Sequence, residues 1–133
     1  MNKACPVILR HNNNKLELLA FKHPNAGNQL VKGNIKKSEP LEIACIRELA
    51  EESGIKGQVV KQLGIWKPDF KQQVWGFCLM HYEGVLPDTW AFQTQDDGGH
   101  IFNFFWQPLD SPLSGDWNEV YSQAFQYIRN TLD

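Results

Sequence analysis

The stretch that decides the fold of this chain is GNIKKSEPLEIACIRELAEESGI, residues 33–55. Three acidic residues, Glu48, Glu51 and Glu52, fall within five positions of it. Like charges this close together repel one another unless a cation neutralises them. The stretch therefore predicts a metal site, and the metal in turn indicates the chemistry.

This stretch also predicts a helix at residues 40–53. Pro40 suits the first turn, where its missing N–H costs nothing. Glu39, just before it, is expected to serve as an acidic cap near the positive end of the helix dipole. No further Pro or Gly occurs before Gly54, which suits the left-handed conformation that ends many helices.

The predicted helix has two faces of different character. Glu48, Glu51 and Glu52 are spaced by three and four residues, so their carboxylates project from one face. Arg47 precedes Glu51 by four residues and follows Glu39 by eight, within reach of a forked ion pair with either. The apolar stripe consists of Leu41, Ala44, Cys45 and Leu49, with Ile46 on its flank.

Carboxylate groups arranged in this way suit a hard divalent cation, Mg²⁺ or Mn²⁺. Magnesium usually keeps several waters and is completed by substrate phosphates, so a partial set of carboxylates indicates a phosphate-bearing substrate. The alternative is a solvated acidic helix face with ordinary ion pairs. The flanking Gly33, Glu39 and Arg47 favour the functional interpretation.

The pattern Gly33-x5-Glu39-x7-Arg47-Glu48-Leu49-x-Glu51-Glu52-x-Gly54-Ile55 fills every specified position of the Nudix box. The chain therefore resembles the Nudix hydrolase family. The resemblance implies an α/β fold, a Nudix-type α/β/α sandwich with a mixed β-sheet, formed by residues 1–133 as a single domain. It also implies hydrolysis of a nucleoside diphosphate linked to another moiety, X, by attack of water on phosphorus.

The resemblance assigns a role to each residue of the box. The metal ions would polarise the pyrophosphate and lower the pKa of a bound water. Glu39 and Arg47 would orient the helix and its carboxylates. The implied metal ligands are Glu48, Glu51, Glu52 and the carbonyl group of Gly33.

Two positions outside the specified pattern bear on the substrate. Val31 and Lys32 stand where the more common form of the box has Pro and a second Gly. A lysine immediately before the glycine, as Lys32 is here, resembles the dinucleoside polyphosphate and diphosphoinositol branches of the family, where this side chain could contact a phosphate chain. The alternative is a solvated surface lysine. Phe70 falls where some branches place a ring against the base, although most aromatic residues of this chain are expected in the core.

A second candidate stretch is Gln95-Asp96-Asp97-Gly98-Gly99-His100. In the family, an acid from a loop outside the box often completes the metal site or acts as general base, and Asp97 is the candidate here. An acidic turn is the alternative. His100 could also act as a base, although a single His beside a strand is more often structural. Glu83 is a weaker candidate for the extra acid.

The remaining elements suit a mixed sheet covered on both faces. A final helix is expected to start near Ser114 or Asp116, with an apolar stripe from Trp117 to Leu132. The region from Glu83 to Gly99 is expected to be mostly loop. Strands are expected at residues 4–10, 16–22, 29–31, 57–66, 73–82 and 101–107.

Composition limits the classes of partner. The chain has 133 residues, 42% of them hydrophobic, with a net charge of −2, and so offers no extended nucleic-acid surface. Cys5, Cys45 and Cys78 are odd in number without CxxC spacing, which indicates buried thiols in a reducing compartment. With no signal peptide and no apolar stretch of membrane-spanning length, a cytoplasmic protein without a membrane partner is expected.

Three alternatives stay open at this stage. The substrate could be a nucleotide, including a nucleoside triphosphate or a dinucleoside polyphosphate, or a non-nucleotide pyrophosphate. A catalytically silent Nudix-fold module that binds a nucleotide is less favoured, because such modules typically lose box carboxylates and all are present here. Family members are often homodimers, and no feature of the sequence decides the oligomeric state.

Overall fold

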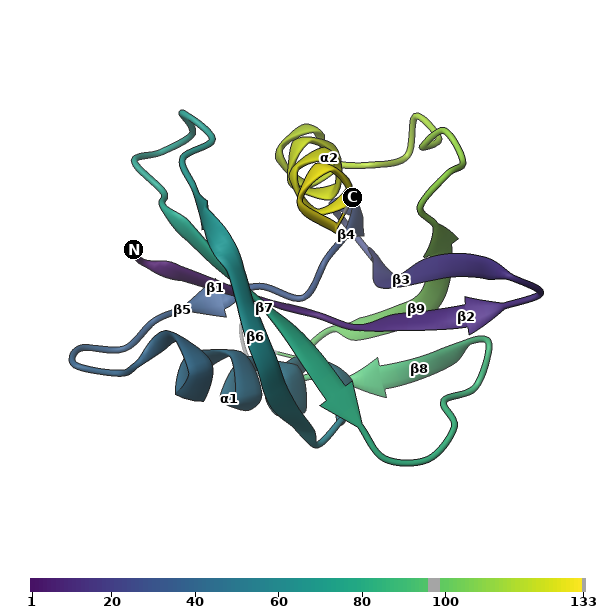
Figure 1. Cartoon of the computed structure of the whole chain (residues 1–133), viewed down its shortest axis with the longest axis horizontal. Coiled ribbons are helices and arrows are strands. Elements are labelled where there is room, and N and C mark those ends of the chain that lie inside the picture. The colour runs from purple at the N-terminus through teal and green to yellow at the C-terminus, as the bar shows by residue number, and fades with distance from the viewer. Residues whose placement is uncertain (96–98, 133) are drawn as a thin grey trace.

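The computed structural model describes residues 1–95 and 99–132, and two helices and two sheets make up this part of the chain (Figure 1). The elements in chain order are β1 (Lys3–Val7), β2 (Leu9–Asn12), β3 (Lys15–His23), β4 (Gly27–Gln29), β5 (Gly33–Asn34), α1 (Leu41–Ser53), β6 (Gly57–Trp66), β7 (Trp75–Tyr82), β8 (Trp90–Gln93), β9 (Ile101–Pro108) and α2 (Glu119–Leu132).

The strands form one mixed and one antiparallel sheet. The mixed sheet has the order β5-β1-β7-β6, in which β1 and β7 run parallel and the other neighbours antiparallel. The second sheet has the order β2-β3-β9-β8, with β4 paired to β3. The predicted α/β fold with a mixed sheet is confirmed, and the strands are divided between two sheets.

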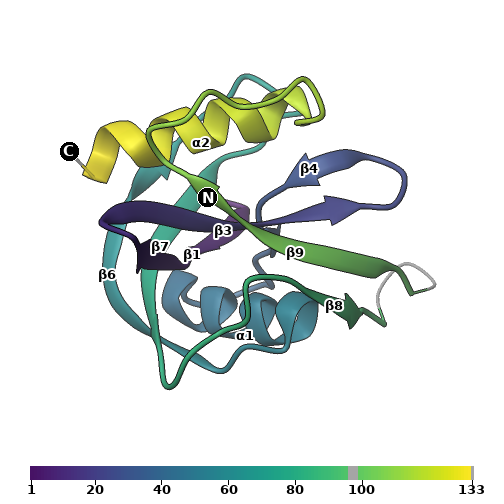
Figure 2. The ribbon, with the colours of Figure 1, turned by 90° about the vertical axis from the view of Figure 1, so that its right-hand side faces the viewer.

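The two helices lie on opposite sides of the strands, as Figure 2 shows. The alternation of side chains along β3 explains why both sides are apolar. Leu19 and Phe21 belong to the core cluster that includes α1, whereas Leu18 and Ala20 belong to the cluster that includes α2. A strand buried on both faces thus joins the two layers, which gives the predicted α/β/α sandwich.

Helix α1 agrees with the predicted helix, and its apolar stripe is buried. Gly54 ends it with φ 80° and ψ 2°, and the Gly54 N–H donates to the Ala50 carbonyl at 3.0 Å. The expectation that Glu39 caps the helix is wrong. The N-cap residue is Pro40, which makes no side-chain capping bond, because the Glu39 carboxylate pairs with Arg47 instead.

Several element boundaries differ from those predicted. The expected strand at residues 4–10 is interrupted at Ile8, because β1 pairs with β7 while β2 pairs with β3 in the other sheet. The expected strand at residues 29–31 is replaced by the short strands β4 and β5, and β8 lies in the expected loop.

The final helix begins later than expected, at Glu119. The side chain of Asn118 explains this start, because its Oδ1 accepts a hydrogen bond from the Val120 N–H at 3.2 Å, as an N-cap residue does. The three cysteines are buried and free, as predicted. Neither α1 nor α2, the helices of the described chain, is long and apolar enough to cross a bilayer.

Candidate active site

The polar face of α1 lines a cleft of about 630 Å³. Residues of β5 and of the adjoining ends of β3 and β9 also line this cleft. Glu48, Glu51 and Glu52, the three glutamates predicted as metal ligands, thus lie at one cleft with Gly33. Its lining residues are Lys3, His23, Lys32, Gly33, Asn34, Lys36, Arg47, Glu48, Glu51, Glu52, Thr94, His100 and Phe102.

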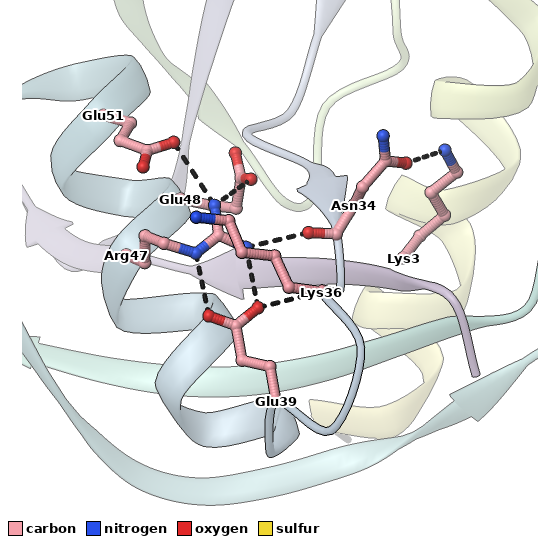
Figure 3. A network of polar contacts seen from close by, with 7 residues as sticks. All are labelled: Lys3, Asn34, Lys36, Glu39, Arg47, Glu48 and Glu51. Carbon is pink, nitrogen blue, oxygen red and sulfur yellow. Dashed lines mark hydrogen bonds and ion pairs between the residues drawn. The ribbon is translucent and has the colours of Figure 1, made fainter.

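Arg47 connects the parts of the box. Its Nε and Nη2 donate to the two oxygens of Glu39, both at 2.8 Å, and its Nη2 also donates to the Asn34 carbonyl at 2.8 Å. Its Nη1 donates to Glu48 Oε1 at 2.6 Å and to Glu51 Oε2 at 3.3 Å. Figure 3 shows the guanidinium group between Glu39 and the other two carboxylates. All five N–H donors of the guanidinium group are therefore engaged.

Glu39 holds the loop that precedes α1. Besides the fork from Arg47, its Oε1 accepts a hydrogen bond from the Lys36 backbone N–H at 3.0 Å. The hydrogen bonds from Arg47 are the main cause that lowers the pKa of Glu39 from 4.5 to about 2. The same contact with Glu39 raises the pKa of the Arg47 guanidinium. The carboxylate thus stays ionised at neutral pH and ties the loop to the helix.

Gly33 is a glycine because the Glu48 carboxyl group lies against its Cα. A β-carbon built on Gly33 would be 1.9 Å from Cδ of Glu48 and 2.0–2.2 Å from its two oxygens. Pairing of β5 with β1, in the register Ala4↔Gly33, holds the Gly33 backbone in this place. Glu48 is only 6% exposed as a result, and its orientation is restricted by Gly33 on one side and Arg47 on the other.

The three glutamates differ in exposure. Glu48 is buried, the side chain of Glu51 is 42% exposed, and Glu52 is half-buried. Arg47 bridges Glu48 and Glu51 through one nitrogen, which offsets their mutual repulsion. Within residues 1–95 and 99–132, no three His, Cys, Asp or Glu side chains are grouped closely enough to hold a metal ion by themselves.

The donor set nevertheless fits a hard divalent cation. The residues at the cleft offer carboxylate oxygens from Glu48, Glu51 and Glu52 and a backbone carbonyl from Gly33, and oxygen is the ligand that Mg²⁺ and Mn²⁺ prefer. The close packing of Glu48 on Gly33 requires the absence of a β-carbon at residue 33. The position of the Glu48 carboxylate therefore depends on the backbone of Gly33.

Lys32 lies in the cleft and packs on two aromatic rings. Its Nζ is 4.7 Å from the ring centroid of Trp75 and 5.0 Å from that of Tyr121. Burial, and then the charge of Lys3, lower the pKa of Lys32 to about 8. Lys3 and Lys36 line the same cleft, and Lys3 Nζ donates to Oδ1 of Asn34. Basic and acidic side chains therefore line the same cleft.

Only some of the other predicted site residues line the cleft. Phe70 is exposed and does not line the cleft. Nζ of Lys71 lies 5.1 Å from the centroid of the Phe70 ring. Glu83 is also outside it, since its side chain is 95% exposed and bonded to His81. His100 does line the cleft. Asp97 and its neighbour Asp96 lie outside the described residues.

Several cleft residues escaped the sequence analysis. Lys3, His23, Thr94 and Phe102 come from β1, from the end of β3 and from the region around the β8–β9 connection. No local motif marks them, because pairing between distant strands brings them to the cleft. The one available signal was the spacing of two between His100, just before β9, and Phe102 within it, which suits one face of an extended segment.

A family model described as the NUDIX domain matches residues 2–127 of this chain. The chain belongs to the NUDIX family. The predicted resemblance to this family is thereby confirmed. No curated protein shows significant similarity to the chain.

Solved structures share the fold of this Nudix chain. One is the NUDIX domain of Shewanella oneidensis NrtR complexed with ADP ribose, with 20% identity, a TM-score of 0.62, and coverage of 98% of this chain and 87% of that chain. An ADP-ribose pyrophosphatase from Streptococcus suis has 15% identity, a TM-score of 0.63, and coverage of 96% and 90%. A C. elegans Ap4A hydrolase has 20% identity, a TM-score of 0.65, and coverage of 96% and 93%.

Proposed function

We propose that this Nudix protein is a metal-dependent pyrophosphohydrolase that cleaves a nucleoside diphosphate linked to another moiety, X. One observation carries the proposal: Glu48, Glu51 and Glu52 line one cleft with Gly33, and Lys3, Lys32 and Lys36 line the same cleft. Acidic side chains that can hold a divalent cation, beside basic ones that can hold phosphate oxygens, suit a pyrophosphate group.

In this proposal Glu48, Glu51 and Glu52 hold Mg²⁺ or Mn²⁺, with the Gly33 carbonyl and Asp97 as further candidates. When bound, the metal supplies Lewis acidity and a water of lowered pKa. Arg47 positions the box carboxylates through its contacts with Glu39, Glu48 and Glu51.

The lysines bind the phosphate groups in the same proposal. Lys32 is held over Trp75 and Tyr121, so its ammonium group is positioned before substrate arrives. The names of two structural neighbours, an ADP-ribose pyrophosphatase and an Ap4A hydrolase, support nucleotide substrates as the first to test. A non-nucleotide pyrophosphate is the alternative substrate.

The test is phosphate release from a substrate panel with Mg²⁺ and then with Mn²⁺. The panel contains nucleoside triphosphates, dinucleoside polyphosphates, ADP-ribose, nucleotide sugars, 5′-triphosphate RNA and geranyl diphosphate, with a phosphatase added to reveal the products. Metal-dependent turnover of one class is expected, and chelation of the metal should abolish it.

Variants connect that turnover to the cleft. Glu51→Gln and Glu52→Gln should each lower kcat by about 100-fold or more while the fold is retained, since an amide is a poor replacement for a metal-binding carboxylate. Glu42→Gln is the matched control, because Glu42 lies on the same helix outside the cleft and bonds Gln62. Wild-type rates in Glu51→Gln and Glu52→Gln at saturating metal would overturn the assignment of the site.

A further inference from the structure

Three rings form one wall of the cleft, here called the aromatic wall: His23, His100 and Phe102. The centroid of His23 is 4.9 Å from that of His100 and 5.3 Å from that of Phe102. The rings of His100 and Phe102 are nearly parallel, with 5° between their planes and 6.5 Å between centroids. Figure 2 shows the end of β3 and the start of β9 on the same side of the molecule.

The aromatic wall is fixed from behind. Phe102 stacks on the buried Phe21, with centroids 4.1 Å apart and planes inclined by 16°. His100 is held through its backbone, because its N–H donates to Thr94 Oγ1 at 3.2 Å and its carbonyl accepts from the Thr94 N–H at 2.8 Å. Thr94 is itself only 3% exposed. These contacts hold the ring of Phe102 and the backbone of His100 in place.

The contacts of His23 favour the neutral form of its ring. Its Nδ1 accepts a hydrogen bond from the Asn25 backbone N–H at 3.0 Å, so a proton at Nδ1 would break that bond. Burial and the neighbouring His100 also lower the pKa of His23. The neutral ring carries its proton on Nε2, which is then a donor rather than a charge.

The cleft is thus divided by chemistry. Lys3, Lys32 and Lys36 supply positive charge for phosphates, whereas the aromatic wall supplies ring faces beside the buried hydroxyl of Thr94. A planar heterocycle stacks on such ring faces whichever base it belongs to, whereas a phosphate group has no ring to stack.

We infer that the aromatic wall binds the nucleobase of the substrate, so that the enzyme acts on nucleotides in preference to non-nucleotide pyrophosphates. The inference rests on the proposed function for its catalytic meaning, but base binding can be measured without turnover. His23, His100 and Phe102 are then residues that determine specificity.

Calorimetric binding of AMP, GMP, CMP and UMP, each compared with ribose 5-phosphate, tests this inference. The nucleotides carry the same sugar and phosphate and add only a base, so the difference in affinity reports on the base alone. At least one nucleotide should bind roughly 5- to 100-fold more tightly than ribose 5-phosphate. Equal binding of all five compounds to the wild-type protein would overturn the inference.

Variants test whether the preference for nucleotides over ribose 5-phosphate comes from the aromatic wall. His100→Ala and His23→Ala should reduce nucleotide affinity toward that of ribose 5-phosphate, whereas His81→Ala, an imidazole outside the cleft, should leave it unchanged. His100→Phe keeps a ring and should retain most of the preference, which guards against a fold defect in His100→Ala. A full nucleotide preference in both alanine variants would contradict the inference.

The two proposals can fail separately. If Glu52→Gln abolishes metal-dependent turnover but no nucleotide is preferred over ribose 5-phosphate, the aromatic wall has been misassigned and the proposed function stands. If the panel shows no turnover but the nucleotide preference disappears in His100→Ala, the aromatic wall stands and the hydrolase proposal fails.

Discussion

At the scale of single residues, Gly33 illustrates how a missing β-carbon controls the position of a side chain in the next element. Its backbone pairs with Ala4 and its Cα touches the Glu48 carboxyl group. The φ of Gly33 is not in the left-handed region and so does not require glycine. Glycine is required because a β-carbon would overlap the Glu48 carboxyl group. Substitution at this position should therefore act on the cleft more than on the backbone.

Gly33→Ala should displace the Glu48 carboxylate and lower turnover by about 100-fold, because small misplacements at an active site have effects of that size. Turnover of the preferred panel substrate and the thermal midpoint Tm are the measurements. The matched control is Gly115→Ala, since no atom lies within 4 Å of a β-carbon there and its φ is not left-handed. Equal activity in the two variants would contradict the close packing of Glu48 on Gly33.

Arg47→Lys should be far from conservative. Lysine has one nitrogen and cannot reproduce the fork on Glu39 together with contacts to Glu48 and Asn34. We expect a loss of about 1–3 kcal/mol in the free energy of unfolding and a lower kcat. Urea unfolding and steady-state kinetics measure these effects.

The control for this change is Arg129→Lys on α2, an arginine outside the cleft that bonds the Leu109 carbonyl and Gln126. It should leave kcat unchanged. If Arg47→Lys retained both the stability and the kcat of the wild type, Arg47 would not be the residue that positions the box.

At the scale of elements, the end of α1 combines two constraints on one residue. Gly54 has φ 80°, which favours glycine, and a β-carbon there would be 2.8 Å from Cε1 of Phe92 on β8. Beside it, Ser53 Oγ donates to the Leu49 carbonyl at 2.6 Å and accepts from the Ile55 N–H at 3.2 Å. The helix end is thereby fixed by local hydrogen bonds and by packing against β8.

Gly54→Ala should lower the free energy of unfolding by about 1 kcal/mol or more, from backbone strain and the clash together. The double variant Gly54→Ala with Phe92→Leu separates the two causes, because it relieves the clash and keeps the strain. Thermal unfolding of the single and double variants is the measurement. A Tm equal to that of the wild type in Gly54→Ala would show that this helix end tolerates a side chain.

Helix α1 was predictable from the sequence because its signals are local. The absence of Pro and Gly, the spacing of apolar residues and the final Gly54 all act within a few turns. The role of Glu39 as a cap was not predicted correctly, since the fork with Arg47 competes for the same carboxylate. The break at Ile8 also escaped prediction, because it reflects a change of partner strand.

At the scale of the whole molecule, the Glu39–Arg47 pair should couple folding to pH. The folded pKa of Glu39, about 2, is below its ordinary 4.5, so the stabilisation is fully present above 4.5 and is lost as pH falls toward about 2. The wild type should therefore lose stability in this range partly through Glu39.

Urea unfolding at about pH 6 and about pH 3 measures this coupling. Glu39→Gln should be less stable than the wild type at the higher pH and should lose less stability on acidification. Glu42→Gln, whose carboxylate bonds an amide rather than an arginine, should follow the wild type. An identical pH dependence in the wild type and Glu39→Gln would assign the acid sensitivity to other groups.

The sequence by itself determined the Nudix box, the helix that carries it and the pairing of Arg47 with Glu51, because helical geometry converts spacing into proximity. Only the tertiary structure decided that His23 faces His100, that Lys32 packs on Trp75 and Tyr121, and that Phe70 lies outside the cleft. These contacts depend on which strands pair and in which register. That choice is made by burial across both sheets, which no local spacing encodes.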